Sequence, residues 1–231
     1  MNHYWHRIWL GVRRWHAKRR ARRQPLAPPV AELLQRPTPS PAAKFEDTEF
    51  LCLDIETTGL NAASAEMLSV GWLLIRNGRA ELASAECHIV KPQGEVGDSA
   101  CVHGLTDTAC ENGRDCRDVM ARIVSLLPGR VLVVHHAGLD KVLLNRLCHK
   151  FYGVPLLVPV VDTLELEHRR LRRRPEKRQS LRLGALRAAY GLPAYRAHDS
   201  LVDAIATAEL LLAMVARHGS KEGVRLAEII A

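Results

Sequence analysis

The sequence predicts one α/β domain in which helices flank a mixed β-sheet, preceded by a basic extension. Two apolar runs, residues 67–75 and 81–90, are separated by an Asn-Gly dipeptide, which is a strong signal for a tight β-hairpin. Farther along, expected helices alternate with short apolar runs at 130–135 and 158–162, as in parallel strands joined by helices. A chain of 231 residues is long enough for one such domain and an extension.

The first strand is expected in FLCLDIETTGL, residues 50–60, where Phe50, Leu51 and Leu53 suit a protein interior. The two hairpin strands follow it. The remaining elements are expected in this order: helix 114–127, strand 130–135, helix 138–151, strand 158–162, and two or three further helices, the last near 199–217.

The basic charge of the chain is concentrated at its start. Residues 1–44 contain ten Lys or Arg and one acid, Glu32, so their net charge is +9. The formal net charge of the whole chain is +8, so the remaining residues together carry 8 − 9 = −1. Apolar residues at helical spacing among the cations allow three roles for residues 1–24: a contact with nucleic acid or another polyanion, a membrane-surface helix, or a partner-docking helix. A solvated, disordered segment is the alternative. Residues 25–41 are rich in Pro and predict an extended linker.

These observations divide the chain into an extension with its linker, residues 1–44, and a domain, residues 45–231. No apolar run approaches the roughly 18 to 20 residues that span a bilayer, so no transmembrane helix is expected. None of the six cysteines forms a CxxC pair, which argues against a zinc ribbon or a thioredoxin-type site. With no secretory signal, a cytoplasmic location is expected. The oligomeric state is left open.

Two carboxylates interrupt the end of the first strand. Asp54 and Glu56 are two residues apart, so their side chains project from the same face of the strand. Open α/β sheets usually bind ligands at this end of their strands. Two close anions repel each other, and a hard divalent cation such as Mg²⁺ or Mn²⁺ removes that repulsion. Solvated carboxylates at a strand end are the alternative.

Further acids occur where two other elements begin. Asp140 lies in the first turn of the helix that follows VLVVHH, where a carboxylate also favours the helix N-terminus electrostatically. In that segment His135 and His136 are further possible metal ligands. His198 precedes the start of the last long helix, and Asp203 lies in its first turn. Because five residues span about 500° of a helix, His198 can approach Asp203 only from the preceding loop.

Together these segments resemble the DEDDh, or DnaQ-like, exonuclease family, which includes the proofreading subunit of bacterial DNA polymerase III. The resemblance rests on FLCLDIETTGL, VHGLTD (102–107), VHHAGLD and HDSLVDAIATAELL, and it covers residues 50 to about 215. It implies a ribonuclease H-like fold with a mixed five-stranded sheet. It also implies a metal-dependent 3′–5′ exonuclease that releases nucleoside 5′-monophosphates.

The resemblance assigns a role to each matching residue. Asp54, Glu56 and Asp203 would hold one divalent cation, Mg²⁺ or Mn²⁺, and Asp54 with Asp140 would hold a second. His198 resembles the general base of the family. The residues implied to contact the terminal nucleotide are Thr57, Thr58 and Gly59 through their backbone, Leu60 as a wedge against the base, and His103 and Thr106 as the lining of its pocket.

Two positions beside Asp140 depart from the family pattern. His136 stands where many relatives have Asn, and Leu139 stands where they often have Phe. Both concern the shape of the pocket and the choice of substrate more than catalysis.

The implied partner is nucleic acid with a free 3′ end, single-stranded or frayed. DNA is the first expectation and RNA the alternative, and a polymerase or another replication or repair protein is a further possible partner. The stretch 169–187 holds nine cations and could guide a nucleic-acid backbone, or could be a solvated loop. The competing hypothesis is a catalytically silent nucleic-acid-binding module, which would be indicated by a missing acid, and none is missing.

Overall fold

The computed structural model describes residues 10–14, 17, 26–94, 107–173, 180–218 and 222–230. Within these residues the elements are α2 (Pro28–Gln35), β1 (Phe50–Thr57), β2 (Met67–Arg76), β3 (Arg79–Ile89), α4 (Asp107–Glu111), α5 (Cys116–Leu126), β4 (Val131–Val134), α6 (Ala137–Tyr152), β5 (Val160–Asp162), α7 (Thr163–Arg173), α8 (Leu183–Ala189), α9 (Ser200–His218) and α10 (Leu226–Ile229).

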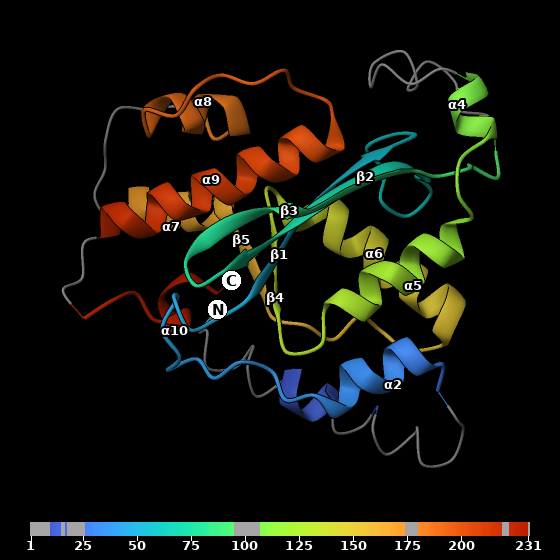
Figure 1. Ribbon diagram of the computed structural model, residues 1–231, viewed down its shortest axis with the longest axis horizontal. Coiled ribbons are helices and arrows are strands. Elements are labelled where there is room, and N and C mark those ends of the chain that lie inside the picture. The colour runs from blue at the N-terminus through green and yellow to red at the C-terminus, as the bar shows by residue number, and fades with distance from the viewer. Residues whose placement is uncertain are drawn as a thin grey trace.

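The five strands form one mixed sheet in the order β3-β2-β1-β4-β5. The pairs β1–β2 and β2–β3 are antiparallel, whereas β1–β4 and β4–β5 are parallel. Figure 1 shows α7, α8 and α9 on one side of this sheet and α5 and α6 on the other. The predicted five-stranded sheet flanked by helices is confirmed.

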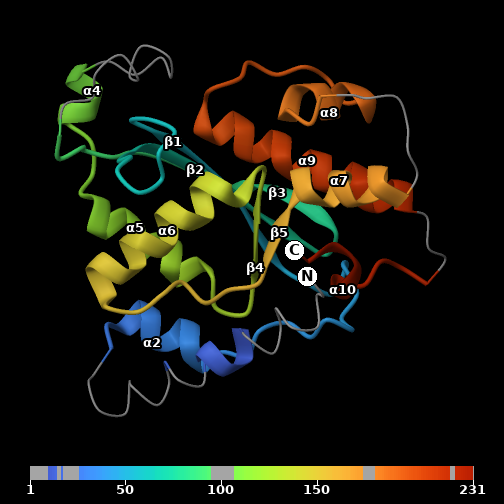
Figure 2. The same ribbon diagram turned by 180° about the vertical axis from the view of Figure 1, so that it is seen from behind.

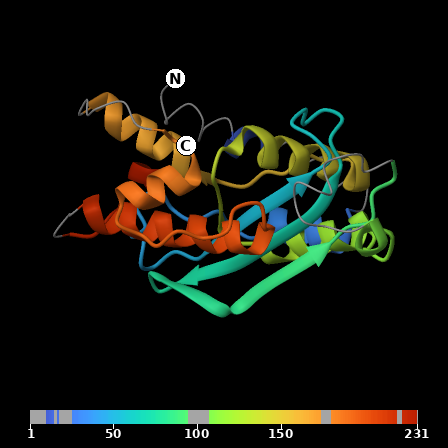
Figure 3. The ribbon, with the colours of Figure 1, turned by 90° about the horizontal axis from the view of Figure 1, so that it is seen from above.

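The expected hairpin joins β2 to β3 through a two-residue turn. Asn77 and Gly78 both have positive φ, 50° and 67°, between the paired residues Arg76 and Arg79. Asn and Gly are the residues that tolerate this backbone conformation best. The hairpin places β3 at the outer edge of the sheet, which is visible from above in Figure 3.

The alternation of side chains along β1 builds two hydrophobic cores. Leu51, Leu53 and Ile55 belong to the core that β1 shares with α2, α5 and α6. Phe50 and Cys52 belong to the core that β1 shares with α9 and α10. A residue at an even position near the end of β1 therefore projects toward the α9 side.

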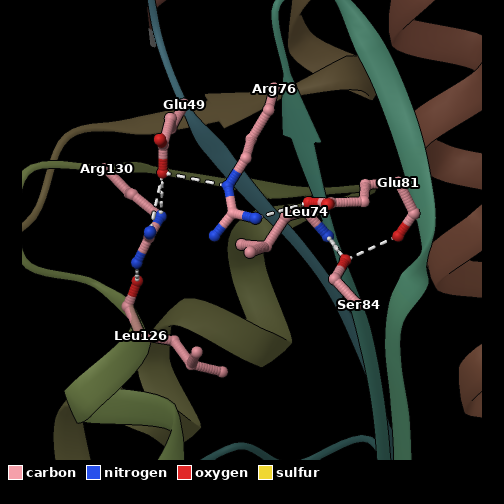
Figure 4. Close-up of polar contacts among 7 residues, drawn as sticks. All are labelled: Glu49, Leu74, Arg76, Glu81, Ser84, Leu126 and Arg130. Atoms are coloured by element: carbon pink, nitrogen blue, oxygen red, sulfur yellow. Dashed lines mark hydrogen bonds and ion pairs between the residues drawn. The ribbon is translucent and has the colours of Figure 1, made fainter.

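Polar contacts fix the other end of the sheet, away from the end of β1 (Figure 4). Glu49, just before β1, accepts a hydrogen bond from Arg130 Nε at 2.7 Å and lies 3.4 Å from Arg76 Nε. Arg76 also pairs with Glu81 of β3 at 2.6 Å. At the bulge of β2, Leu74 N donates to Ser84 Oγ at 2.8 Å. These contacts tie the starts of β1, β3 and β4 to the end of β2.

The prediction of an extended linker over residues 25–41 is wrong for its central part. Pro28–Gln35 forms α2, which begins with Pro in its first turn, where the missing N–H costs nothing. Val30, Leu33 and Leu34 of α2 are buried in the core with α5 and α6, and Figures 1 and 2 show α2 against that side of the molecule. The apolar spacing of VAELL outweighs the flanking prolines. The boundary between residues 44 and 45 stays a prediction.

Part of the basic extension also packs on the domain. Residues 10–14 are helical, and the guanidinium of Arg14 is buried. It donates to the carbonyl oxygens of Leu157 at 2.7 Å, Leu33 at 2.8 Å and Arg36 at 2.7 Å. Arg14 therefore joins the extension to the end of α2 and to the chain before β5.

None of the helices formed by the described residues combines the length and the apolar character needed to cross a membrane.

Candidate active site

The two carboxylates of β1 project toward α9. Asp54 and Glu56 occupy even positions of the strand, as Phe50 and Cys52 do. Glu56 is buried, with 7% of its surface exposed, and Asp54 is partly buried. The two acids thus lie on the same face of β1 as Phe50 and Cys52, which pack in the hydrophobic core beneath α9.

The start of α9 is brought onto the sheet by a glycine of β2. A Cβ at Gly71 would lie 2.3 Å from the backbone N and Cα of Leu201, so only glycine admits the helix this closely. Ser69 Oγ donates to Ser200 Oγ at 3.1 Å across the same contact. Asp199 caps the helix by accepting from the N–H of Leu201 at 3.0 Å.

This packing places Asp203, in the first turn of α9, opposite the β1 acids. One carboxylate oxygen from each of Asp54, Glu56 and Asp203 lies within 4.8 Å of the other two. Burial and the charges of Asp203 and Asp199 raise the pKa of Glu56 to about 7. Burial and the nearby charges of Asp140, Glu56 and Asp203 raise the pKa of Asp54 well above its usual value. Without a bound cation, it is therefore unfavourable for Asp54 and Glu56 to be ionised at the same time.

Asp140 joins the cluster electrostatically from the first turn of α6. It is buried, and burial raises its pKa to about 7. Its charge is the largest of those that raise the pKa of Asp54. Its oxygens are not part of the group within 4.8 Å, which consists of the other three acids. The structure thus brings Asp140 beside Asp54 rather than into the triad.

Asp162, at the end of β5, holds the start of α6 in place. Its two oxygens accept hydrogen bonds from the N–H groups of His136 at 3.0 Å and Ala137 at 2.8 Å. One of them also accepts from Leu164 N at 3.0 Å and Glu165 N at 3.4 Å, in α7. One buried carboxylate therefore caps two helices, one of which carries Asp140.

His135 and His136 are not arranged as metal ligands. The ring nitrogens of His135 lie 2.8 Å from Thr163 Oγ1 and 3.0 Å from Leu181 O, so both are within hydrogen-bond distance of protein atoms. His136 is exposed and has a left-handed backbone, with φ 75°, where α6 begins. Leu139, the second departure from the family pattern, is partly buried.

His198 lies in the loop before α9, as its spacing from Asp203 required. It has a left-handed backbone, with φ 68°, and its N–H donates to Asp203 Oδ2 at 2.9 Å. The exposed side chain of His198 is close enough for its charge to act on the Asp203 carboxylate.

The turn after β1 is held in a fixed shape. Thr57 Oγ1 donates to Gly59 O at 2.8 Å, and Thr58 exchanges hydrogen bonds with Glu66 at 3.0 and 2.9 Å. Arg146 of α6 donates to Ala63 O at 2.7 Å and to Ala65 O. Leu60 projects from this turn with 93% of its surface exposed.

Comparisons with known proteins assign this arrangement to a family. A family model described as Exonuclease (RNase_T) matches residues 51–211. The chain belongs to this exonuclease family. The matched residues contain all four acids and His198, and the exonuclease predicted from the motifs is confirmed at the level of family and enzyme class.

This exonuclease matches very different shares of its individual relatives. The PolC-type DNA polymerase III of Thermotoga petrophila is 30% identical over 174 residues, which is 75% of this chain and 12% of that protein. The DNA polymerase III subunit epsilon of Treponema pallidum is 28% identical over 185 residues, 78% of this chain and 83% of that protein. The chain therefore spans only a small part of the PolC-type relatives.

Solved structures of exonuclease I share the fold. One, described as suggesting how processivity is achieved, has a TM-score of 0.64 at 20% identity and covers 73% of this chain and 41% of that chain. The E. coli enzyme in complex with a dA16 oligonucleotide has a TM-score of 0.64 at 20% identity, over 74% of this chain and 41% of that one. The ribonuclease H-like fold of this exonuclease is thereby confirmed.

The acidic triad fits a divalent cation. Asp54, Glu56 and Asp203 offer only carboxylate oxygens, the donors that hard cations such as Mg²⁺ and Mn²⁺ prefer. Burial and the neighbouring carboxylates raise the pKa of Asp54 and of Glu56, and a bound divalent cation would favour the ionised form of both acids.

Two predicted site residues, His103 and Thr106, lie outside the described residues. Two acids beside the cluster were not predicted for the site, Asp162 and Asp199. Asp162 ends a parallel strand, so the rule that drew attention to Asp54 could have found it. Asp199 caps α9, and its charge also reaches the cluster.

Proposed function

We propose that this exonuclease removes nucleoside 5′-monophosphates from single-stranded or frayed DNA 3′ ends by two-metal hydrolysis. The observation that carries the proposal is the gathering of Asp54, Glu56 and Asp203, from β1 and α9, beside Asp140 of α6. Asp54, Glu56 and Asp203 would hold one divalent cation, and Asp54 with Asp140 a second. Bound there, Mg²⁺ or Mn²⁺ would activate water and offset negative charge on the leaving oxygen.

His198 acts as the general base in this proposal. Its backbone is fixed to Asp203 by the hydrogen bond from its N–H, and its side chain is exposed beside the acid cluster. A neutral imidazole can accept a proton from water, and histidine is the side chain that enzymes use most often for this purpose.

The turn after β1 positions the terminal nucleotide. Leu60 would pack against the last base, and the backbone of Thr57, Thr58 and Gly59 would approach its sugar. A Cβ at Gly59 would meet no protein atom within 4 Å. The fold itself therefore does not require glycine there, whereas a nucleotide lying close to the backbone would.

The relatives favour DNA as the substrate, because those named above are DNA polymerase III proteins. The epsilon subunit is matched over most of its length, which supports association with a polymerase as part of the proposal. The predicted cytoplasmic location, and the contact of residues 1–24 with a polyanion or a membrane surface, remain predictions.

The test is shortening of 5′-labelled DNA and RNA oligonucleotides of the same sequence in Mg²⁺ or Mn²⁺. We expect single-nucleotide steps from the 3′ end with DNA, and none in EDTA or with Asp54→Asn. Faster shortening of RNA would assign the protein to exoribonucleases. Absence of shortening on both substrates, or full activity of Asp54→Asn, would refute the proposal.

A further inference from the structure

A cavity lies at the far end of α9 from the acid cluster. It has a volume of about 550 Å³ and is lined by residues of α7, α9 and α10 and by Tyr190, which follows α8. Figure 2 shows α7 beside the end of α9, with α10 below them. The apolar lining of the cavity includes Leu166, Met214 and Ile229. Asp203 and Arg217 are 14 residues apart on α9, so the cavity is about 21 Å from the cluster at 1.5 Å per residue.

The rim of the cavity is strongly basic. Four arginines line it, namely Arg169, Arg170, Arg173 and Arg217, and His218 adds a fifth basic side chain. Two acids also line it, Glu167 and Glu228. With His218 neutral, the lining carries a net charge of 4 − 2 = +2.

Both acids are engaged by the fold. Glu167 is 1% exposed, pairs with Arg170 at 2.7 Å and accepts from Tyr190 OH at 2.7 Å. Glu228 accepts from Arg225 N at 2.7 Å, capping α10. Glu167 and Glu228 therefore do not neutralise all of the arginines of the rim, and some of these arginines keep an uncompensated positive charge.

Arg173 and Arg217 supply that charge at the mouth of the cavity. Both are exposed, and no carboxylate of the described residues forms an ion pair with either. The guanidinium of Arg217 lies 5.1 Å from the centre of the Tyr190 ring. Arginines beside an aromatic ring and an apolar floor suit a ligand that carries both negative charge and flat apolar groups.

We propose that this cavity binds the same nucleic-acid strand on the 5′ side of the 3′ end held at the acid cluster. Phosphates would contact Arg173 and Arg217, and a base or sugar would pack on Tyr190 and Leu166. The proposal rests on the proposed function, since that function supplies a polyanion whose end is fixed about 21 Å away. At about 3.4 Å per nucleotide of stacked strand, that distance corresponds to about six nucleotides. The basic stretch 169–187 singled out in the sequence thereby gains a specific contact.

The test measures binding without turnover, so that it is independent of catalysis. Fluorescence anisotropy in EDTA compares labelled DNA strands of about twelve nucleotides and about three nucleotides, with Arg173→Ala/Arg217→Ala against the wild type. The matched control is Arg36→Ala/Arg79→Ala, which removes two exposed arginines, one directly after α2 and one at the start of β3. Equal melting temperatures of the three proteins show that folding is intact.

For the long strand we expect the double cavity variant to raise the Kd roughly tenfold, as the loss of charge-assisted contacts implies. The slope of log K against log salt should become less steep by about 1.4, the value for two single-strand phosphates. The short strand, which cannot reach, should show a much smaller change. Arg173→Lys/Arg217→Lys should restore most of the affinity.

Three results would overturn the proposal: an unchanged Kd for the long strand, an equal loss for both strands, or the same loss in the control variant. Tight binding of an acidic peptide that the cavity variant abolishes, with unchanged DNA binding, would assign the cavity to a protein partner instead. If shortening fails while the long-strand effect is seen, the proposed function is wrong and the cavity assignment stands.

Discussion

Replacing Glu56 by Gln should stabilise the metal-free protein while it abolishes activity. Gln has nearly the same shape as Glu and carries no charge, so the substitution removes the cost of ionising a buried carboxyl group close to the charges of Asp203 and Asp199. That cost follows from the raised pKa, which shifts from 4.5 to about 7. At 1.36 kcal/mol per pKa unit, the shift corresponds to about 3 kcal/mol.

The sign of the effect depends on pH. A carboxyl group with a raised folded pKa binds more protons in the folded state than in the unfolded state between pH 4.5 and 7. The stability of the metal-free wild type therefore falls as the pH rises through this window. The difference from Glu56→Gln should be small near pH 4.5 and reach its full value by pH 8.

The assay is thermal unfolding in EDTA at pH 4.5 and pH 8. For a chain of this size, 1 kcal/mol shifts Tm by about 2–4 °C, so Glu56→Gln should melt about 6–12 °C above the wild type at pH 8. Glu32→Gln, which changes an exposed acid of α2, is the control and should show no such difference. Saturating Mn²⁺ should raise the Tm of the wild type more than that of Glu56→Gln. A Tm of Glu56→Gln below the wild type at pH 8, or an equal difference at both pH values, would refute the reasoning.

Three further substitutions test how the site is positioned. Gly71→Ala should cost about 1–3 kcal/mol of stability in urea unfolding and lower turnover, because the new methyl displaces the start of α9. Gly184→Ala, on a helix with open space around it, is the control and should be close to neutral. Asp162→Asn should cost about 1–3 kcal/mol and lower kcat, because the amide nitrogen cannot accept a backbone N–H. Its control is Asp115→Asn, since Asn caps a helix as well as Asp. Leu60→Ala should leave stability within about 0.5 kcal/mol and raise the KM for DNA severalfold, measured by steady-state shortening.

Each of these expectations has a contrary outcome. Normal turnover of Gly71→Ala would show that α9 can shift without moving its acid. If Asp115→Asn lost as much stability as Asp162→Asn, the loss in Asp162→Asn would be explained by ordinary helix capping alone. Unfolding of Leu60→Ala at lower urea would give this exposed side chain a structural role instead of a substrate contact.

The sheet and the main helices could be predicted because their signals are local. The hairpin depends on two residues that accept positive φ, and the alternation along β1 reports both of its faces. The helix α2 was missed because its short apolar stripe is set among prolines, and only burial against α5 and α6 reveals its role.

The candidate site could be predicted in part. The motifs identified the four acids and His198, but spacing alone could not show which oxygens would meet. The structure gathers three of the acids closely and places Asp140 beside Asp54. The contributions of Gly71 and Asp162 are tertiary, since each acts on a helix distant in the chain. The strand-end rule could have found Asp162, but no local pattern shows which helix either residue holds in place.

The central claim is that the acids of β1 and α9 form a divalent-cation site. Isothermal titration calorimetry of the purified protein with Mn²⁺ at pH 8 tests this cation site most directly. The wild type should bind Mn²⁺ at the cluster, and Asp54→Asn should lose that binding while the exposed control Glu32→Gln retains it. Equal Mn²⁺ binding by Asp54→Asn and the wild type, or none by either, would contradict the claim.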